Sequence, residues 1–297
     1  MRELVVISGK GGTGKTSLLA SFAVLAGEAV LADCDVDAAD LHLVLSPRVG
    51  RREVFRSGHE AVIRPELCQG CGKCLDLCRF QAISSQEPAS GRTREHDRVL
   101  YRVDPLACEG CGVCVRFCPH GAIDFPQQVC GEWFVSDTRC GPMVHARLGV
   151  AAENSGKLVS TVRMQARSEA EARGLELILV DGPPGIGCPV IASLTGASSV
   201  LVVTEPTPAG EHDLARVLAL CRHFGLPAVV CVNKWDLNET MTEQIEKLAE
   251  KQGAAVADRI PYDRAVTEAQ LQARAVVEMG GPAAEAVHRV WKRFQSS

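Results

Sequence analysis

The chain has 297 residues, a formal net charge of −4 and 14 cysteines. Its hydrophobic content of 46% and charged content of 23% are typical of a soluble globular protein, so neither a fibrous nor a disordered chain is indicated. No basic block and no apolar run of roughly 18 residues occur, so we expect neither nucleic-acid binding nor a membrane span.

The cysteine content is unusual for such a chain. Disulfide scaffolds are small secreted proteins, whereas this chain is long and Met1-Arg2-Glu3 leads directly into a predicted strand without a leader. We therefore expect a cytoplasmic protein whose thiolates are held for metal.

Short apolar runs alternate with helical patterns at both ends of the chain. A strand is predicted at 3–8, a helix at 15–27 and a strand at 29–35. Further on, the same patterns predict strands at 175–181, 199–205, 227–233 and 254–261, and helices at 210–225 and 239–253. This alternation predicts an α/β fold with a doubly wound, mostly parallel sheet, whose ligands bind beyond the carboxyl ends of the strands.

Residues 61–128 interrupt the alternation and contain an internal duplication. The run from Cys68 to Ile83 (CQGCGKCLDLCRFQAI) recurs from Cys108 to Ile123 (CEGCGVCVRFCPHGAI) with the same cysteine spacing. We expect a nucleotide-binding domain in two parts, residues 1–60 and 129–297, with an inserted small α+β domain at 61–128.

A phosphate-binding loop follows the first predicted strand. Residues 9–16 read GKGGTGKT, which fits G-x-x-x-x-G-K-[ST] between a strand and a helix. Lys15 is expected to reach the β- and γ-phosphates, and Thr16 to bind Mg²⁺. The residues expected to hold the phosphates are Gly9, Gly11, Gly12, Thr13, Gly14, Lys15, Thr16 and Ser17.

A second lysine in this loop, Lys10, makes it resemble the deviant P-loop of the MinD, ParA, Mrp and nitrogenase-iron-protein superfamily of ATPases. The resemblance implies that Lys10 reaches the nucleotide of a partner across a dimer. In LADCDVDAADLHL it implies that Asp35 handles the attacking water and that Asp33 lies near the metal. In LILVDGPPG it implies that Asp181 is the Walker B carboxylate.

The base-binding segments are also implied by this resemblance. VNKWD supplies Asn233 as a base reader, and IPYD, with Pro261, Tyr262 and Asp263, closes over the adenine. Because Asn233-Lys234-x-Asp236 also resembles a guanine reader, GTP remains an alternative to ATP. For Asp37 and Asp40 we expect solvent exposure or helix capping.

Each cysteine run has the spacing C-x2-C-x2-C-x3-C, which is the pattern of bacterial two-cluster ferredoxins, in which the fourth cysteine ligates the other cluster. Zinc is the alternative, but two cysteine pairs make one zinc site, and the duplication favours cubes. Pro119 follows Cys118 as the pattern expects, whereas Arg79 follows Cys78. The expected ligands are Cys68, Cys71, Cys74 and Cys118 for one [4Fe–4S] cluster, and Cys108, Cys111, Cys114 and Cys78 for the second.

The order of these parts resembles the branch of the superfamily with an inserted two-cluster ferredoxin domain. It implies an ATPase with ATP, Mg²⁺ and two [4Fe–4S] clusters, coupling a nucleotide switch to electron transfer or cluster assembly. The implied partners are a second copy or a related ATPase, and a redox or cluster-accepting protein. Alternatives are a ParA/MinD-like positioning switch with redox-sensing clusters, and an electron carrier with a vestigial P-loop, which the intact loop argues against.

Three features lie outside these motifs. Cys188 either packs at a helix start or, as in the nitrogenase iron protein, helps to hold a cluster shared by two subunits. The C-terminal AVHRVWKRFQSS is expected to pack on its own domain rather than on a membrane. Residues 141–159 are expected near the active face. The remaining cysteines are expected to be small buried hydrophobic residues at Cys34, Cys221 and Cys231, with no metal spacing at Cys130 and Cys140.

Overall fold

The computed structural model of the protein describes residues 1–86, 99–149 and 154–295. The chain divides into two compact units. The first comprises Met1–Val54, Glu132–Leu148 and Ser155–Ser297, and the second comprises Phe55–Gly131 and Gly149–Asn154. The predicted insert, residues 61–128, lies within the second unit.

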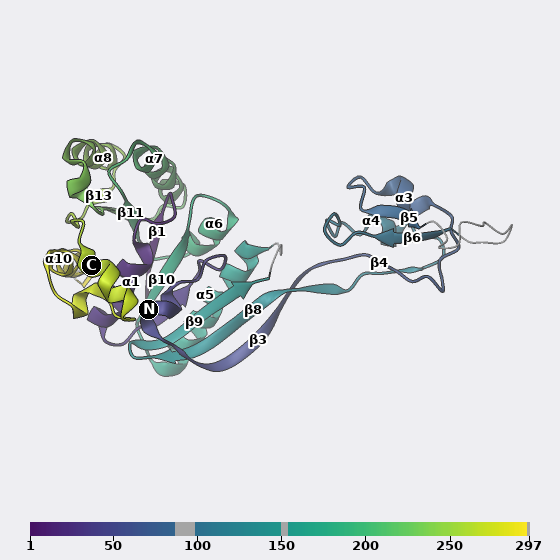
Figure 1. The fold of residues 1–297 in the computed structure, drawn as a ribbon, viewed down its shortest axis with the longest axis horizontal. Coiled ribbons are helices and arrows are strands. Elements are labelled where there is room, and N and C mark those ends of the chain that lie inside the picture. The colour runs from purple at the N-terminus through teal and green to yellow at the C-terminus, as the bar shows by residue number, and fades with distance from the viewer. Residues whose placement is uncertain (87–98, 150–153, 296–297) are drawn as a thin grey trace. The chain divides into compact units, whose positions relative to one another are not determined.

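A nine-stranded sheet forms the centre of the first unit in the described residues, in the order β13-β12-β11-β1-β10-β2-β9-β8-β3 (Figure 1). The pairs from β13 to β9 are all parallel, which confirms the predicted α/β fold with a mostly parallel sheet. The strands are β1 (Arg2–Ser8), β2 (Val30–Asp33), β3 (Arg48–His59), β8 (Gln127–Thr138), β9 (Gly141–Leu148), β10 (Leu177–Pro184), β11 (Ser199–Thr204), β12 (Ala228–Val232) and β13 (Ala255–Val256).

Three strands of this sheet were not predicted: β3, β8 and β9. β3 reads RVGRREVFRSGH and is largely exposed, so it lacks the continuous apolar run that marks a buried parallel strand. β8 and β9 are joined by the two-residue turn Arg139–Cys140, as in a hairpin. Half of the segment 141–159 is therefore β9 beside β2, while 150–153 lies outside the described residues.

The predicted strand at 254–261 was wrong in its length, since β13 covers only Ala255–Val256. Beyond it the chain still follows β12, because the Ile260 N–H donates to the Val232 carbonyl at 3.1 Å. Between these points the side chain of Asp258 pairs with Arg289 of α10.

Helices cover both faces of the sheet. Strand residues such as Leu4 and Val6 pack with α1 and α10, and the opposite face is covered by α5 and α6, which contact each other. The alternation of side chains along β1 accounts for these two cores. The helices of this unit are α1 (Lys15–Ala26), α2 (Leu41–Leu45), α5 (Ser155–Arg173), α6 (Cys188–Leu194), α7 (Pro208–His223), α8 (Glu239–Lys251), α9 (Arg264–Leu271) and α10 (Pro282–Gln295), with 3₁₀ turns at Trp235–Leu237 and Val276–Glu278.

The C-terminal helix α10 packs on its own unit, as the sequence predicted. Val290 and Trp291 are buried, and the ring centroid of Trp291 lies 5.0 Å from that of Phe22 in α1. Within the part of the chain that the structure describes, no helix is long and apolar enough to cross a membrane.

Five of the six cysteines outside the two runs, all except the exposed Cys188, are buried as small apolar residues. Cys34, Cys221 and Cys231 are buried. Burial raises the pKa of Cys221 to about 11 and that of Cys231 to about 12, so neither is a ready thiolate. Cys130 and Cys140 are also buried.

The second unit is small and repeats its own architecture. Strands β4 (Val62–Ile63) and β7 (Ile123–Asp124) form one antiparallel pair, and β5 (Ile83–Gln86) and β6 (Leu100–Val103) form another. Helices α3 (Lys73–Leu77) and α4 (Val113–Arg116) each begin directly after a glycine in the left-handed conformation. The small core between the pairs contains Ala61, Ile83, Val103 and Ile123.

Candidate functional site

The loop after β1 has a backbone that only glycine accommodates at several positions. Gly12 and Gly14 have φ values of 81° and 90°. A Cβ atom on Gly14 would lie 2.5 Å from Nδ2 of Asn233, and one on Gly9 would lie 2.3 Å from Cβ of Asp213. The glycine spacing of the motif is thus required by the packing of this loop.

The loop brings a lysine and a threonine next to two acidic residues. Lys15 is 5% exposed, and its Nζ lies 3.9 Å from Oδ2 of Asp35. Thr16 Oγ1 donates a hydrogen bond of 2.6 Å to Oδ2 of Asp181. The predicted catalytic residues Lys15, Asp35 and Asp181 are therefore close together, although they lie up to 166 positions apart in the sequence.

Asp33 and Asp181 are paired residues on the neighbouring strands β2 and β10, and both are fully buried. Burial raises the pKa of Asp181 to about 6, against the opposing effects of Lys15 and of the Thr16 hydrogen bond. Burial, and then the charge of Asp181, raise the pKa of Asp33 well above its usual range. This concentration of carboxylates favours a cation at the site.

The oxygens of the two carboxylates are used differently. Both oxygens of Asp33 accept backbone N–H groups, from Asp35 at 3.2 Å and from Leu41 at 3.3 Å. Oδ1 of Asp181 is buried and has no hydrogen-bond partner among the described residues. Asp33 thus orders the segment that carries Asp35, whereas only one oxygen of Asp181, the one that accepts from Thr16, has a hydrogen-bond partner among the described residues.

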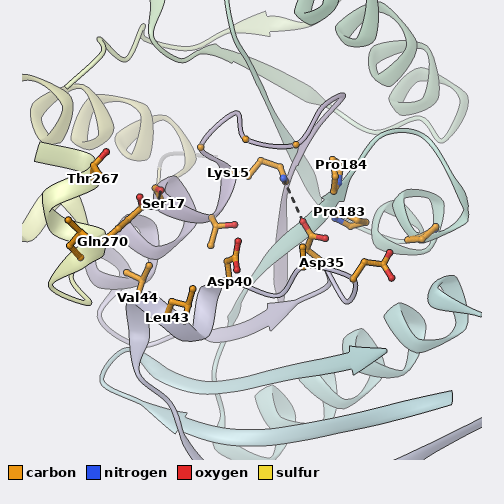
Figure 2. Close-up of a pocket in the computed structure, with 18 residues that line it drawn as sticks. Lys15, Ser17, Asp35, Asp40, Leu43, Val44, Pro183, Pro184, Thr267 and Gln270 are labelled. Carbon is orange, nitrogen blue, oxygen red and sulfur yellow. Dashed lines mark hydrogen bonds and ion pairs between the residues drawn. The ribbon is translucent and has the colours of Figure 1, made fainter. Parts of the chain in front are cut away.

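A cavity of about 730 Å³ opens in front of these residues (Figure 2). Its floor is the phosphate loop from Gly11 to Ser17, and Asp35 faces it from the other side. Asp37 and Asp40 are exposed, as expected, and also line the cavity. The remaining lining residues are Ala38, Leu43, Val44, Pro183, Pro184, Pro189, Thr267, Gln270 and Leu271.

The parts of the cavity wall that come from α2 and α9 were not predicted from the sequence. Gln270 of α9 donates a hydrogen bond of 2.7 Å to the Ser17 hydroxyl, which ties α9 to the start of α1. No local motif marks Thr267, Gln270 or Leu271, because the fold alone brings α9 to the loop. Pro183 and Pro184 could have been found, since they directly follow the Walker B residue.

Some predicted residues lie beside the cavity without lining it. Asn233 donates from Nδ2 to the Thr13 carbonyl at 2.8 Å, so its side chain supports the loop. Tyr262 is 52% exposed, and Asp263 caps α9 by accepting from the N–H of Ala265. Lys10 and Pro261 do not line the cavity either, and Lys10 is exposed.

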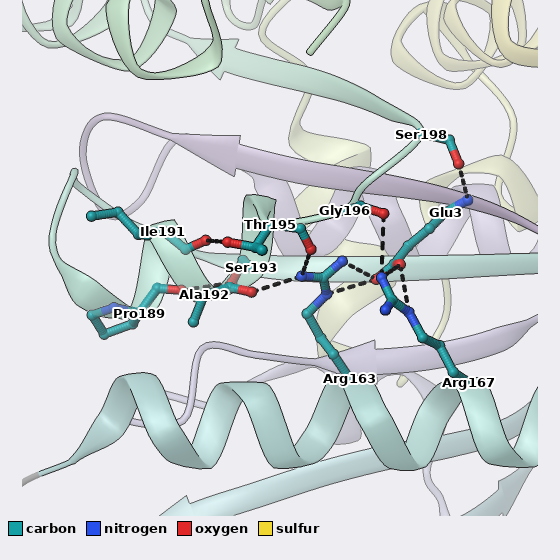
Figure 3. A network of polar contacts seen from close by, with 10 residues as sticks. All are labelled: Glu3, Arg163, Arg167, Pro189, Ile191, Ala192, Ser193, Thr195, Gly196 and Ser198. Carbon is teal, nitrogen blue, oxygen red and sulfur yellow. Dashed lines mark hydrogen bonds and ion pairs between the residues drawn. The ribbon is translucent and has the colours of Figure 1, made fainter. Parts of the chain in front are cut away.

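Helix α6, which follows the segment LILVDGPPG with Asp181, is anchored at its end (Figure 3). Nη1 of Arg163 donates to the carbonyls of Ala192 and Thr195, each at 2.7 Å. Arg163 and Arg167 share the buried carboxylate of Glu3, with hydrogen bonds of 2.7 Å from Nε of Arg163 and from Nη2 of Arg167. The network holds the end of α6 to α5 and β1, whereas the exposed Cys188 lies at the other end.

In the second unit the eight cysteines of the two runs line two small cavities. The first cysteine cavity is lined by Cys68, Cys71, Cys74 and Cys118, and the second cysteine cavity by Cys78, Cys108, Cys111 and Cys114. The backbone N–H of Ala122 donates to Sγ of Cys118, and that of Ala82 donates to Sγ of Cys78. Across the described ranges, no group of three or more His, Cys, Asp or Glu side chains is arranged to hold a single metal ion.

Residues 4–276 match the family described as the CobQ/CobB/MinD/ParA nucleotide binding domain. The chain belongs to this family. It is also 32% identical over 248 residues to an uncharacterized protein of Methanocaldococcus jannaschii, which covers 80% of this chain and 79% of that protein. A second uncharacterized protein of the same organism is 22% identical over 275 residues, or 90% of each chain.

Solved structures of the family share this fold. The cell division ATPase MinD of Pyrococcus furiosus superposes with a TM-score of 0.56 at 17% identity, covering 99% of this chain and 98% of that one. MinD of Pyrococcus horikoshii, solved with Mg-ADP, superposes with a TM-score of 0.57 at 17% identity, covering 99% of this chain and 95% of that one. Since both identities are below 25%, the similarity concerns the fold.

Proposed function

We propose that this protein is an ATP-hydrolysing switch that carries two [4Fe–4S] clusters and couples its nucleotide state to electron transfer or cluster assembly on a partner protein. The observation that carries the proposal is the combination in one chain of two kinds of site. A phosphate loop contacts the carboxylates of Asp35 and Asp181, and two cavities are each lined by the four cysteines that one cluster needs.

The nucleotide part of the proposal rests on the loop cavity. Lys15 would neutralise the β- and γ-phosphates, and the loop N–H groups and the start of α1 would hold the anion. Thr16 and the free oxygen of Asp181 fit a Mg²⁺ ion, which would neutralise charge on the transferred phosphate. Asp35, held by the buried Asp33, would orient the attacking water. The Mg-ADP complex of the Pyrococcus horikoshii relative supports ATP over GTP.

A dimer is proposed from Lys10. Lys10 occupies the position in the loop at which the superfamily has its inter-subunit lysine. Its side chain is exposed and does not line the cavity of its own subunit. A second copy, or a related ATPase, would therefore receive this lysine at its own nucleotide. The MinC:MinD complex of Aquifex aeolicus is a precedent for a further partner protein.

The cluster part of the proposal rests on the two cysteine cavities, and residues 61–128 are proposed as a ferredoxin-like domain. The sets of cysteines around them are the sets that the cross-ligated ferredoxin pattern requires, with Cys118 in the first cavity and Cys78 in the second. A cube spreads its four thiolates over four irons, so they lie farther apart than ligands of one ion. The absence of a single-ion site among the described residues is compatible with such a cluster. When bound, these clusters would supply one-electron chemistry.

Replacing Asp35 separates binding from hydrolysis. Asp35→Ala is expected to slow ATP turnover by at least about 100-fold, because orientation and deprotonation of the attacking water are lost. ATP affinity should stay within a few-fold of wild type, since Lys15 and the loop remain. Single-turnover hydrolysis and equilibrium binding measure the two quantities. Asp137→Ala, which removes an exposed carboxylate on β8, is the control. An unchanged turnover rate in Asp35→Ala would contradict this role.

The role of Cys188 is tested by iron analysis of dimers. If Cys188 holds a cluster shared by two subunits, wild-type dimers should contain more iron than Cys188→Ser dimers when both are purified under reducing conditions. The EPR signals of the insert clusters should be the same in both. Equal iron contents would assign Cys188 to the packing at the start of α6.

A further inference from the structure

The internal duplication makes the two cysteine cavities comparable position by position. The comparison rests on the proposed function, because it concerns clusters that would fill these cavities. The backbone contributions are matched. The N–H of Ala122 lies 3.4 Å from Sγ of Cys118 in the first cavity, and that of Ala82 lies 3.3 Å from Sγ of Cys78 in the second. The side chains that line the two cavities, in contrast, differ at several matching positions.

The aromatic side chain beside each run differs by a hydroxyl group. A Cβ atom on Gly72 would lie 3.2 Å from the hydroxyl oxygen of Tyr101, which lines the first cavity. At the matching glycine, Gly112, a Cβ atom would lie 3.3 Å from the ring of Phe125, which lines the second cavity. The first cavity thus has a hydrogen-bond donor where the second has a hydrocarbon ring.

The charged side chains differ in the same direction. Gln69 lines the first cavity, whereas its counterpart forty positions later, Glu109, lines the second. Lys73 also lines the first cavity, and its counterpart is Val113. The lining of the first cavity therefore contains a lysine that the second lacks, and the lining of the second contains a carboxylate that the first lacks.

A third pair follows the fourth cysteine of each run. His120 lines the first cavity, and its counterpart Phe80 lines the second. Arg79 has Pro119 as its counterpart, but unlike Lys73 and Glu109 it does not line a cysteine cavity.

We propose that the cluster held by Cys68, Cys71, Cys74 and Cys118 has the higher reduction potential of the two, so that the first electron to enter the protein resides there. Reduction adds one negative charge to a cluster and makes or breaks no bond. A nearby cation and a hydroxyl donor stabilise that charge, whereas a carboxylate and apolar rings disfavour it. An electron on the second cluster would pass to the first, which gains one electron as the other loses one.

The test is a potentiometric titration of the full-length protein followed by EPR, with dithionite as the reductant and iron content measured on the same sample. Two separate one-electron waves are expected. Lys73→Val, which installs the counterpart residue, should lower the higher potential and leave the lower one nearly unchanged. Glu109→Gln gives the second cavity the residue found at the matching position of the first, Gln69, and should raise only the lower potential. Tyr101→Phe, which leaves the charge unchanged, should also lower the higher potential.

Glu66→Gln is the control, because Glu66 is exposed in the same unit and lines neither cavity. In Glu66→Gln, each of the two potentials should shift by less than the lower potential shifts in Glu109→Gln. A single wave, or a Glu109→Gln variant that moves the higher wave, would overturn the assignment while leaving the two clusters in place. A protein that binds no iron would instead overturn the proposed function.

Discussion

Lys15→Ala is expected to weaken ATP binding by at least about 100-fold, or roughly 2.7 kcal/mol. Lys15 is buried under the loop, and its ammonium group is the cation that faces the cavity next to Asp35. Without it, the phosphates would face the carboxylates of Asp35 and Asp181 with only backbone N–H groups to hold them. Isothermal titration calorimetry with ATP and Mg²⁺ measures the loss.

Two variants make this result specific. Lys251→Ala removes an exposed lysine at the end of α8 and should bind ATP like the wild type. Lys10→Ala should also bind ATP but hydrolyse it slowly, because its proposed target is the nucleotide of the other subunit. A folded Lys15→Ala protein with wild-type affinity would exclude the loop cavity as the ATP site.

Removing cluster ligands is expected to have the second large effect. Anaerobically purified wild-type protein should contain about eight irons per chain, as two cubes require. Cys118→Ser should retain about four, because the first cysteine cavity then has three ligands. Cys221→Ala, which removes a buried thiol of the first unit, should retain all of the iron.

Double variants test the cross-ligation directly. Cys71 and Cys118 lie in different runs but line the same cavity, so the double variant should lose no more iron than either single one. Cys111 and Cys118 lie in the same run but line different cavities, so replacing both should remove both clusters. The opposite pattern would assign each run to a single cluster, and stoichiometric zinc with little iron would contradict clusters altogether.

Contiguous motifs are the part of the site that the sequence predicted well. The loop from Gly9 to Thr16 needs glycine at fixed positions and lies between a strand and a helix, so local chemistry defines it. Asp35 and Asp181 follow predicted parallel strands, whose carboxyl ends meet at one edge of the sheet. Their proximity to Lys15 therefore follows from the fold class.

Features that depend on tertiary packing could not be predicted in this way. The α9 wall reaches the loop through a tertiary contact, the hydrogen bond from Gln270 to Ser17. No local pattern in the residues around Gln270 indicates this contact. β3 and β8 carry arginine and polar residues on exposed surface, so their apolar periodicity is weak. The contrast between Tyr101 and Phe125 lies outside the repeated cysteine motif, and only the distances to Gly72 and Gly112 make it visible.

Chain connectivity would give a physical basis for the proposed coupling between nucleotide and clusters. Two of the boundaries between the units, after Val54 and after Gly131, fall within β3 and β8, so at these two places the chain passes from one unit to the other through a continuous strand. β8 continues through a tight turn into β9. β9 pairs with β2 at Asp33, whose carboxylate accepts a hydrogen bond from the backbone N–H of Asp35. The segment that carries Asp33 and Asp35 therefore lies next to a hairpin whose first strand, β8, continues along the chain from the cysteine runs.

The most direct test of the account is a potentiometric titration of the clusters in Asp35→Ala protein with and without ATP. A coupling of about 1–3 kcal/mol predicts that ATP shifts at least one midpoint potential by roughly 40 to 130 mV. By reciprocity, ATP affinity should differ about 5- to 150-fold between oxidised and reduced protein. Potentials that coincide within error, together with equal ATP affinities in the two redox states, would contradict the claim that nucleotide and redox states are linked in this chain.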